Sequence, residues 1–313
     1  MSSQASVVAR RVFYLSPHPD DVALSCAGSL LADVAAGADV TLLSVFVSGE
    51  SAATRRAEDE QAARALGCKY LSLDLFDAPD RPEIHGSLGL FMPYGPPHLG
   101  ITSEVVARLR WHVSAPAELV APLAVGGHID HRIVHEAARA LAFELGLQLA
   151  YFEDLPYSLS RFSVARRLAA LETSVPRLAG TDRGTVAMER AAYRDYLCGL
   201  PLFRRYPPGL RFLLGHLVAR TAVRADGQAH RPGPRPDLTA QLQTVTANSP
   251  ARLAAIAAYA SQWPLFAVSA EELLARVVDY GRTLGPALPD DKTYERLWHD
   301  RAFPPRMDHS ESG

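Results

Sequence analysis

Two short runs of the sequence gather side chains that bind metal ions and transfer protons. The first run, residues 16–21, reads Ser-Pro-His-Pro-Asp-Asp, and the second run, residues 126–131, reads Gly-Gly-His-Ile-Asp-His. Imidazole and carboxylate groups are the usual protein ligands of catalytic zinc when no cysteine motif is present. A further carboxylate beside such an ion can accept a proton from water. The two runs together predict a metal-dependent hydrolase.

The spacing within the first run suggests which of its side chains can bind the same metal ion. His18 and Asp21 are three residues apart, so in a tight turn both can reach one point, whereas Asp20 points elsewhere. Pro19 stiffens this turn because its ring fixes its own φ angle. A catalytic zinc ion takes three protein ligands and leaves a position for water, so a third ligand is expected from the second run.

The second run offers two histidines, His128 and His131. One can bind the metal while the other donates a proton or stabilises the oxyanion at a reacting carbonyl. Asp130 can hold a ring nitrogen of that histidine and fix its tautomer. A pair made by His131 and His135, four residues apart on a helix, is less favoured because His135 lies one turn away from the strand edge. The alternative, that the aspartates only cap helices, loses weight because two such clusters each follow a predicted strand.

The elements that must position these runs alternate between strand and helix. Short apolar or β-branched stretches predict strands at 12–15, 40–47, 70–73, 118–122 and 147–152. Helical spacing predicts helices at 22–36, 57–66, 102–113 and 130–145. This alternation predicts an α/β, Rossmann-like fold with a mostly parallel sheet flanked by helices. Both runs then lie at the carboxyl ends of strands, where open α/β sheets bind their ligands.

The second half of the chain is less regular, with helices expected at 161–171, 185–197, 250–262 and 269–284. We expect residues 1–155 to form the Rossmann-like catalytic core that carries the metal site. Residues 156–303 are expected to form a helix- and loop-rich C-terminal extension that packs on the core and shapes the substrate pocket, and residues 304–313 a flexible tail. The proline- and glycine-rich loop 77–100 is interpreted as a wall or lid of the site, with a decorative surface insertion as the alternative.

Composition excludes several classes of protein. The chain has 313 residues, 48% of them hydrophobic, and a formal net charge of −2, so nothing indicates a nucleic-acid partner. No apolar stretch approaches the roughly 20 residues of a membrane span, and the N-terminus does not read as a signal peptide. The three cysteines are scattered without a Cys-x-x-Cys pair, which suits a reducing, cytoplasmic location. The oligomeric state is not readable from the sequence.

The two runs also resemble the signature motifs of a known family. Residues 16–21 with the following Cys26-Ala27-Gly28, and residues 128–131, are similar to the two motifs of the PIG-L/LmbE-like family, whose members are zinc-dependent N-deacetylases and related amidases with a Rossmann-like fold. The resemblance is strong over residues 10–155. Further similarity lies at the following positions: Arg55, Glu58, Leu66-Gly67, Asp77 and Tyr259-Ala260-Ser261-Gln262.

Carried over by position, the resemblance implies a role for each site residue. It implies the following metal ligands: His18, Asp21 and His131. Asp20 becomes the general base, and His128 the electrophilic or acid partner with Asp130 behind it. Arg55 and Asp77 become substrate contacts, although a surface salt bridge between Arg55 and Glu58 is an equal alternative.

The metal implied is Zn²⁺, with Fe²⁺ or Co²⁺ as other candidates for a site of two histidines and a carboxylate. The sequence departs from the family at Val22, where many members carry glutamate, and at Ala27, where glycine is common. These departures leave the ligand positions intact and bear only on the subgroup.

The predicted reaction is removal of an acetyl group from an N-acetylated amino sugar or a glycoside-containing small molecule, which releases acetate and a free amine. Antibiotic biosynthesis is one of several open pathways. One alternative is an amidase that cleaves a larger acyl or cysteinyl amide of a thiol-sugar conjugate. Another is a non-catalytic Rossmann-like module that binds a sugar or nucleotide. That module would need a Gly-x-Gly-x-x-Gly turn after the first strand, and this sequence has none there.

Overall fold

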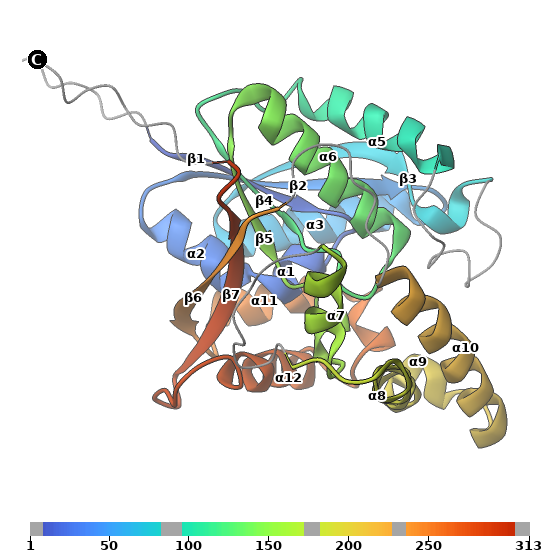
Figure 1. Ribbon diagram of the computed structural model, residues 1–313. Helices are drawn as coiled ribbons and strands as arrows, with labels where there is room; N and C mark the ends of the chain where they lie inside the picture. Colours follow the sequence, from blue (N-terminus) through green and yellow to red (C-terminus); the bar gives the residue numbers. More distant parts are fainter. Residues whose placement is uncertain (1–8, 83–95, 172–181, 227–235, 304–313) are drawn as a thin grey trace, which may run out of the picture.

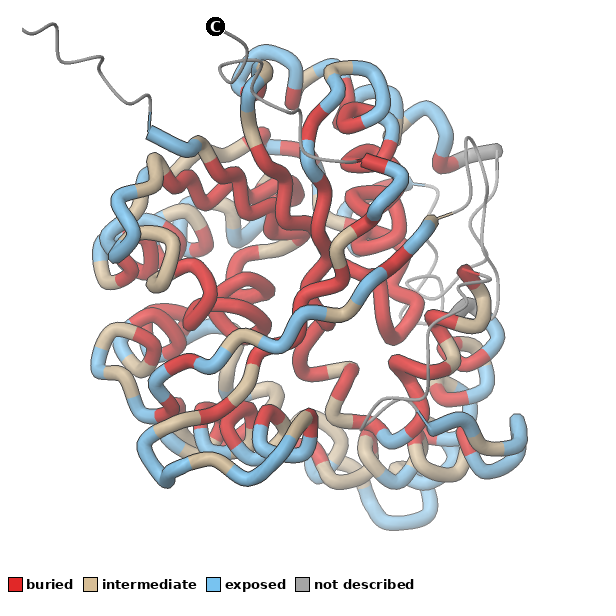
Figure 2. The backbone as a smooth tube through the Cα atoms, turned by 60° about the vertical axis from the view of Figure 1, so that its left-hand side comes forward, coloured by how far each residue is buried: buried red, intermediate tan, exposed pale blue. Residues whose placement is uncertain are grey.

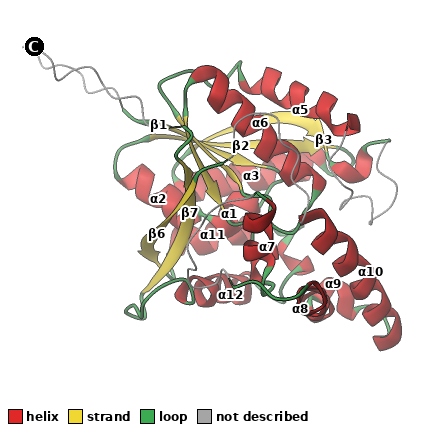
Figure 3. Ribbon diagram, in the orientation of Figure 1, coloured by secondary structure: helices red, strands yellow, loops and turns green. Residues whose placement is uncertain are grey.

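A computed structural model describes residues 9–82, 96–171, 182–226 and 236–303. At its centre is a seven-stranded sheet in the order β3-β2-β1-β4-β5-β7-β6 (Figures 1 and 3). Its strands are β1 (Arg11–Ser16), β2 (Asp39–Ser48), β3 (Lys69–Phe76), β4 (Glu118–Pro122), β5 (Gln148–Phe152), β6 (Leu238–Thr246) and β7 (Lys292–Asp300). Strands β1 to β5 are parallel, whereas β7 is antiparallel to both β5 and β6. The α/β class predicted from the sequence is therefore confirmed, with a mixed edge added to the parallel sheet.

Helices cover both faces of the sheet because the buried strands carry apolar side chains on both sides. Alternate residues of β1 serve different layers: Phe13 and Leu15 pack with α5 (Pro96–Leu109) and α6 (Ile129–Leu145), whereas Val12 and Tyr14 pack on the opposite side. The layer on that opposite side consists of α1 (Asp21–Ser25), α2 (Ala27–Ala35), α3 (Ala52–Leu66) and α11 (Pro250–Ala258).

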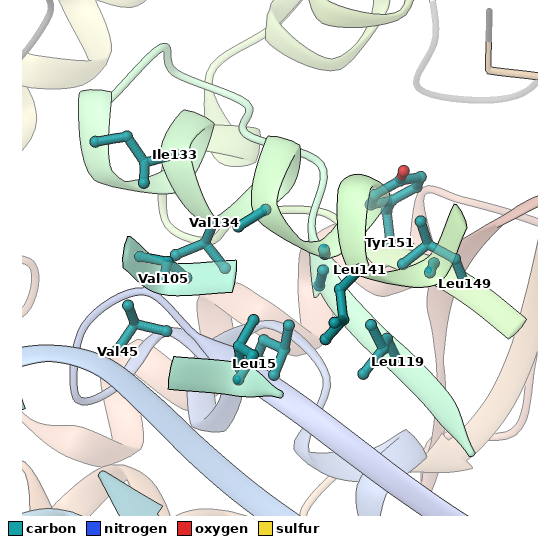
Figure 4. Packing of buried hydrophobic residues seen from close by; sticks show 14 of the residues in the cluster. Leu15, Val45, Val105, Leu119, Ile133, Val134, Leu141, Leu149 and Tyr151 are labelled. Carbon is teal, nitrogen blue, oxygen red and sulfur yellow. The ribbon is translucent and has the colours of Figure 1, made fainter. Parts of the chain in front are cut away.

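Figure 4 shows the first of these layers from close by, with Leu15 and Leu119 of the sheet beneath Val105, Val134 and Leu141. Figure 2 shows that buried residues concentrate in the strands and on the inner helix faces. The sheet is thus a rigid support for the segments that leave its strand ends.

The remaining helices come from the second half of the chain. They are α7 (Ser163–Ala170), α8 (Val186–Gly199), α9 (Pro201–Arg204), α10 (Pro208–Asp226) and α12 (Ala270–Arg282), with short 3₁₀ turns η1 (Ala78–Asp80), η2 (Tyr157–Leu159) and η3 (Trp263–Leu265). Helices α8, α9 and α10 group together on one side of the molecule (Figure 1). They share a small apolar core of their own that includes Tyr193, Leu197 and Val223.

The main differences from the predicted elements are a divided helix, an unpredicted helix and two unpredicted strands. The helix expected at 22–36 is divided at Cys26 into α1 and α2. Helix α10 (Pro208–Asp226) lies where no helix was predicted. Strands β6 and β7 lie in the part expected to be helices and loops, and β7 pairs with β5. The division into a core at 1–155 and an extension at 156–303 stays a prediction, but the two parts share one sheet.

The late strand β7 also fixes the helix that follows the first motif. Its buried Glu295 accepts hydrogen bonds from the backbone amides of Gly28 (2.9 Å) and Ser29 (2.7 Å) at the start of α2. Arg252 of α11 lies 3.0 Å from the same carboxylate and balances its charge. A Cβ atom on Gly28 would lie 2.8 Å from Glu295 and from Val245, so only glycine fits this close approach.

Two predictions fall partly or wholly outside the described residues. Of the expected lid at 77–100, residues 83–95 are not described, and neither is the tail 304–313. Among the residues that are described, no helix combines the length and apolar character needed to span a membrane.

Candidate metal centre

Both sequence motifs lie at the point where the strand order of the sheet reverses. Residue His18 follows β1 and His128 follows β4, and these two strands are neighbours. The chain runs outward from β1 to β3 on one side and from β4 to β5 on the other, so a crevice opens above their carboxyl ends.

Two glycines let the second motif turn into this crevice. Gly126 and Gly127 have φ angles of +86° and +72°, which side chains with a Cβ rarely adopt. A Cβ atom on Gly126 would lie 2.6 Å from the ring of Tyr157. The turn ends at His128, the N-cap of α6, whose Nδ1 accepts a hydrogen bond from the Asp130 amide at 3.3 Å.

The three predicted metal ligands come together around one carboxylate oxygen. Oδ2 of Asp21 lies 3.4 Å from Nδ1 of His18 and 3.4 Å from Nε2 of His131. Ligands held about 2.0–2.2 Å from a common tetrahedral ion are about 3.3–3.5 Å apart. The distance from Asp21 to each histidine therefore suits a zinc-sized ion between them.

In each of the two imidazoles, the ring nitrogen that faces away from Asp21 contacts a second carboxylate. Nδ1 of His131 lies 2.6 Å from Oδ1 of Asp154, and Nε2 of His18 lies 3.0 Å from Oδ2 of Asp130. A carboxylate takes the N–H of the ring and leaves the lone pair of the opposite nitrogen for a metal. Nε2 of His131 is buried and has no hydrogen-bond partner among the described residues.

The charge of the cluster also suits a cation. Its buried or half-buried carboxylates are Asp20, Asp21, Asp77, Asp130 and Asp154. Burial opposes protonation of His18, yet the charge of Asp77 and hydrogen bonds to neighbouring carboxylates hold the pKa of His18 well above its usual value. The surroundings therefore favour positive charge at this point, as a divalent ion would supply.

Among the described residues, two groups that differ from the predicted ligand set have all their possible ligand atoms within 4.8 Å of one another. They are His18 with His128 and His131, and His18 with Asp77 and Asp130. In the first group, Nδ1 of His128 already accepts a backbone hydrogen bond. In the second, both carboxylates approach the ring nitrogen of His18 that lies away from Asp21. Both groups share His18, so every arrangement places the ion at the end of β1.

The carboxylate of Asp130 serves a different histidine from the one expected. The family resemblance implied a position behind His128, whereas in the structure the carboxylate faces His18 and also accepts a hydrogen bond from the Ala78 amide at 3.0 Å. Arg81 lies 2.5 Å from its other oxygen. The reason is helix phase: Asp130 stands in the first turn of α6 and projects toward β1, while the ring of His128 lies against the Asp130 backbone amide.

Asp20 lines the same pocket and is held in an unusual backbone conformation. Its φ angle is +99°, which is strained for a residue with a side chain. Its carboxylate makes no hydrogen bond within the described ranges of the chain. Burial, and then the charge of Asp21, raise the pKa of Asp20 well above its usual value. These features give a carboxylate with unused proton-accepting capacity.

The imidazole of His128 also lines the pocket, 4.9 Å from the ring of His18 between centroids. Burial and the nearby charge of His18 lower the pKa of His128 to about 3, so the ring is neutral at pH 7. Since its Nδ1 accepts a hydrogen bond, the tautomer assigned to it carries the proton on Nε2. A neutral imidazole of this kind is a hydrogen-bond donor rather than a strong acid.

Arg55 and Asp77, the predicted substrate contacts, form an ion pair with each other in the pocket wall. The alternative pairing of Arg55 with Glu58 is not the one seen, because Glu58 accepts hydrogen bonds from the amide and hydroxyl of Ser261 at 2.7 Å each. These contacts fasten the family-like segment 259–262 to α3. Gln262 thereby reaches the pocket.

Sequence reasoning missed two partners of the site, Asp154 and Arg81. Asp154 comes two residues after β5, so its position at the carboxyl end of a strand was the available signal. The less favoured ligand His135 lies apart from the ligand atoms: its Nδ1 donates to the carbonyl of Pro122 at 2.9 Å and its ring stacks on Tyr151.

The site opens into a pocket of about 440 Å³, a size suited to a small organic ligand. Its polar end is formed by the strand-end residues described above, including His18, Asp20 and His128. Its other end is formed by the second half of the chain, from Pro156 and Tyr157 through α8, α9, α10 and η3.

The imidazoles and carboxylates clustered at the switch point of this α/β sheet are ligands of the kind that bind divalent metal ions. Residues 13–142 match the sequence model of the GlcNAc-PI de-N-acetylase family, PIG-L. Over this segment the chain is similar to the PIG-L family, in agreement with the resemblance noted from the motifs.

Comparison with individual proteins gives relatives of the same kind. The chain is 36% identical over 170 residues to 2'-N-acetylparomamine deacetylase of Streptomyces fradiae, a match that covers 49% of this chain and 60% of the relative. The chain thus spans less than two thirds of that relative.

Solved structures share the fold over nearly the whole chain. The A40926 pseudoaglycone deacetylase is 20% identical with a TM-score of 0.55, over 93% of this chain and 97% of that one. A deacetylase of the teicoplanin biosynthesis pathway is 18% identical with a TM-score of 0.59, over 92% of this chain and 97% of that one. At these identities the likeness concerns the fold.

Proposed function

We propose that this protein is a metal-dependent N-deacetylase that removes the acetyl group from an N-acetylated amino sugar of a small molecule. The observation that carries the proposal is the arrangement at the switch point. Ring nitrogens of His18 and His131 each lie 3.4 Å from one oxygen of Asp21, and each of these imidazoles contacts a second carboxylate. The carboxylate of Asp20, which makes no hydrogen bond to the described residues, lies in the same pocket. The deacetylase names of the relatives support the same reaction.

The residues that would hold the ion are His18, Asp21 and His131. The buried Nε2 of His131, which lacks a hydrogen-bond partner among the described residues, fits this role. When bound there, a divalent ion supplies Lewis acidity toward the amide carbonyl and toward water. Zinc is the proposed metal, and iron or cobalt are the alternatives that the same ligand set accepts.

The chain's own groups then complete an amide hydrolysis. Asp20 accepts the proton of the attacking water and passes it to the leaving amine. His128 donates the hydrogen bond of its Nε2–H to the oxygen of the reacting carbonyl, as in other oxyanion sites. Asp130 and Asp154 hold the imidazoles of His18 and His131 in one orientation.

Substrate recognition falls to the polar wall of the pocket. The paired side chains of Arg55 and Asp77 present a fixed donor and acceptor to sugar hydroxyls. The proposed substrate is therefore a small sugar-containing molecule and not a nucleic acid. The proposed location of the protein is the cytoplasm.

The proposal is tested by acetate release from a panel of N-acetylated aminoglycosides and simple N-acetylglucosaminides. We expect acetate and free amine in equal amounts, loss of the activity after dialysis against a chelator, and its return with one equivalent of Zn²⁺. Zinc is added without excess because one solved relative is described as a zinc-inhibited form. Unchanged acetate release after verified metal removal would contradict the proposal.

A further inference from the structure

The pocket above the metal centre has two ends of unlike chemistry. One end carries the charged and imidazole side chains of the strand ends. The other end is an apolar wall, made by these residues: Leu197, Leu200, Leu202, Phe203, Leu214, Val218, Leu265 and Phe266. The wall comes from α8, α9, α10 and the η3 turn, all of which lie outside the segment 13–142 that matches the family.

The wall is a packed structure rather than a set of loose side chains. Leu197 and Leu200 belong to the apolar core that joins α8 to α10, together with Tyr193 and Ala222. Phe203 packs against this core from α9. Helices α8, α9 and α10 form one group on this side of the molecule (Figure 1), so part of the wall is held by the packing between these helices.

The polar groups of this region are few. Around the wall the pocket is also lined by Tyr196, Tyr206, Gln262 and Arg205. A molecule covered with hydroxyl groups would leave many of them without hydrogen-bond partners against eight aliphatic and aromatic side chains, and such burial is costly. An apolar group placed there gains from leaving water.

We propose that the substrate carries an apolar chain or ring of several carbons attached to its N-acetylated amino sugar, and that this group binds the wall formed by α8, α9, α10 and η3. The inference rests on the proposed function for the position of the sugar and amide. It adds the substrate class: an amphiphilic glycoside, with its polar sugar over the metal centre and its apolar part on the wall.

Binding measured by calorimetry on the purified full chain tests the wall without using activity. The probes are the methyl and octyl β-glycosides of N-acetylglucosamine, below the concentration at which the octyl compound forms micelles. We expect the octyl glycoside to bind at least about tenfold more tightly, about 1.4 kcal/mol. Equal dissociation constants for the two glycosides would overturn the proposal.

Two neighbouring leucines of α10 provide a matched pair of variants. Leu214 lines the pocket, whereas Leu213 is 53% exposed and is not among the pocket residues. We expect Leu214→Gln to lower the ratio of octyl to methyl affinity severalfold and Leu213→Gln to leave it unchanged. Leu202→Gln on α9 repeats the test at a second, half-buried position. An unchanged ratio in both pocket variants, with folding verified by circular dichroism, would refute the role of the wall.

A third probe decides where the apolar group is attached. If methyl N-octanoylglucosaminide binds more tightly than the octyl glycoside of N-acetylglucosamine, the wall takes an acyl chain, which would contradict the proposed N-acetylated substrate. The reverse order assigns the wall to the aglycone. Acetate release from the same compounds is scored separately, so tight octyl binding without any hydrolysis would reject the N-deacetylase proposal and keep the apolar subsite.

Discussion

The Oδ1 atom of Asp154 lies 2.6 Å from Nδ1 of His131, and this contact decides which nitrogen of the imidazole faces Asp21. Both side chains are buried. The other oxygen of Asp154 accepts a hydrogen bond from the Val125 amide at 2.8 Å, so the carboxylate is held from both sides. The end of β5 therefore orients a ligand candidate that belongs to α6.

Replacement of Asp154 by asparagine tests this relationship. The amide must satisfy the N–H groups of both His131 and Val125, and it has only one oxygen that accepts. We expect Asp154→Asn to weaken zinc binding about 10- to 100-fold, measured by competition with a chromophoric chelator. The control Asp279→Asn changes a carboxylate whose side chain is 76% exposed, and its zinc affinity should equal that of the wild type. An Asp154→Asn protein with wild-type affinity would exclude the orienting role.

Asp20 is the residue on which the proposed proton transfer depends. Asparagine tolerates positive φ angles as aspartate does, so Asp20→Asn keeps the turn while it removes the base. We expect kcat to fall about 10²- to 10⁴-fold while the metal content stays at one ion per chain. Metal is measured by elemental analysis on the same samples used for acetate release. Near-normal turnover of this variant would show that another group accepts the proton.

The parts of this fold that the sequence predicts are those with simple periodicity. The β-branched stretch 40–47 and the apolar stretch 118–122 correspond to β2 and β4, because strands buried on both faces carry nearly continuous runs of apolar residues. Their alternation with helices then placed both motifs at one edge of the sheet. The position of the candidate site at that edge is therefore predictable from the strand and helix pattern alone.

In the parts that were not predicted, buried polar groups have hydrogen-bond or ion-pair partners that are distant in the sequence. Strand β7 reads Lys-Thr-Tyr-Glu-Arg-Leu-Trp-His-Asp, and its buried Glu295 and Arg296 hide the strand pattern. Arg296 is paired with Glu153 of a segment 143 residues earlier, at 2.5 Å. In the same way, the partner of Asp130 depends on the rotational phase of α6, which the spacing of a motif does not determine.

Gly28 offers a test of the contact between α2 and β7. A Cβ atom there would approach Glu295 and Val245 to 2.8 Å, so we expect Gly28→Ala to lower the free energy of unfolding by about 1–3 kcal/mol. The matched control is Gly100→Ala in α5, where nothing lies within 4 Å of the added atom. That change should stabilise the helix by up to about 1 kcal/mol. Urea unfolding measures both, and opposite signs are expected; a neutral Gly28→Ala would show that the strand shifts freely.

Asp59 gives a prediction about pH, because it is a fully buried carboxyl group between α3 and the segment after α11. Burial raises the pKa of Asp59 from 3.8 to about 6, against hydrogen bonds donated by Ser44, Tyr259 and Tyr70 that lower it. The folded state then binds more protons than the unfolded state between these two values. The stability that the protonated Asp59 contributes to the fold is complete at low pH and is lost as the pH rises through about 6.

Asp59→Asn removes this titration while it keeps a neutral side chain of the same shape. The free energy of unfolding of the wild type, relative to this variant, should therefore fall between pH 4 and pH 7, by at most about 3 kcal/mol. Denaturant unfolding of both proteins across that range is the measurement. Asp195→Asn, at a position whose side chain is 66% exposed, should run parallel to the wild type. If the curve of unfolding free energy against pH for Asp59→Asn also ran parallel to that of the wild type, the pKa of Asp59 would have its ordinary value in the folded protein. The hydrogen bonds from Tyr70 and Tyr259 would then offset the effect of burial on that pKa.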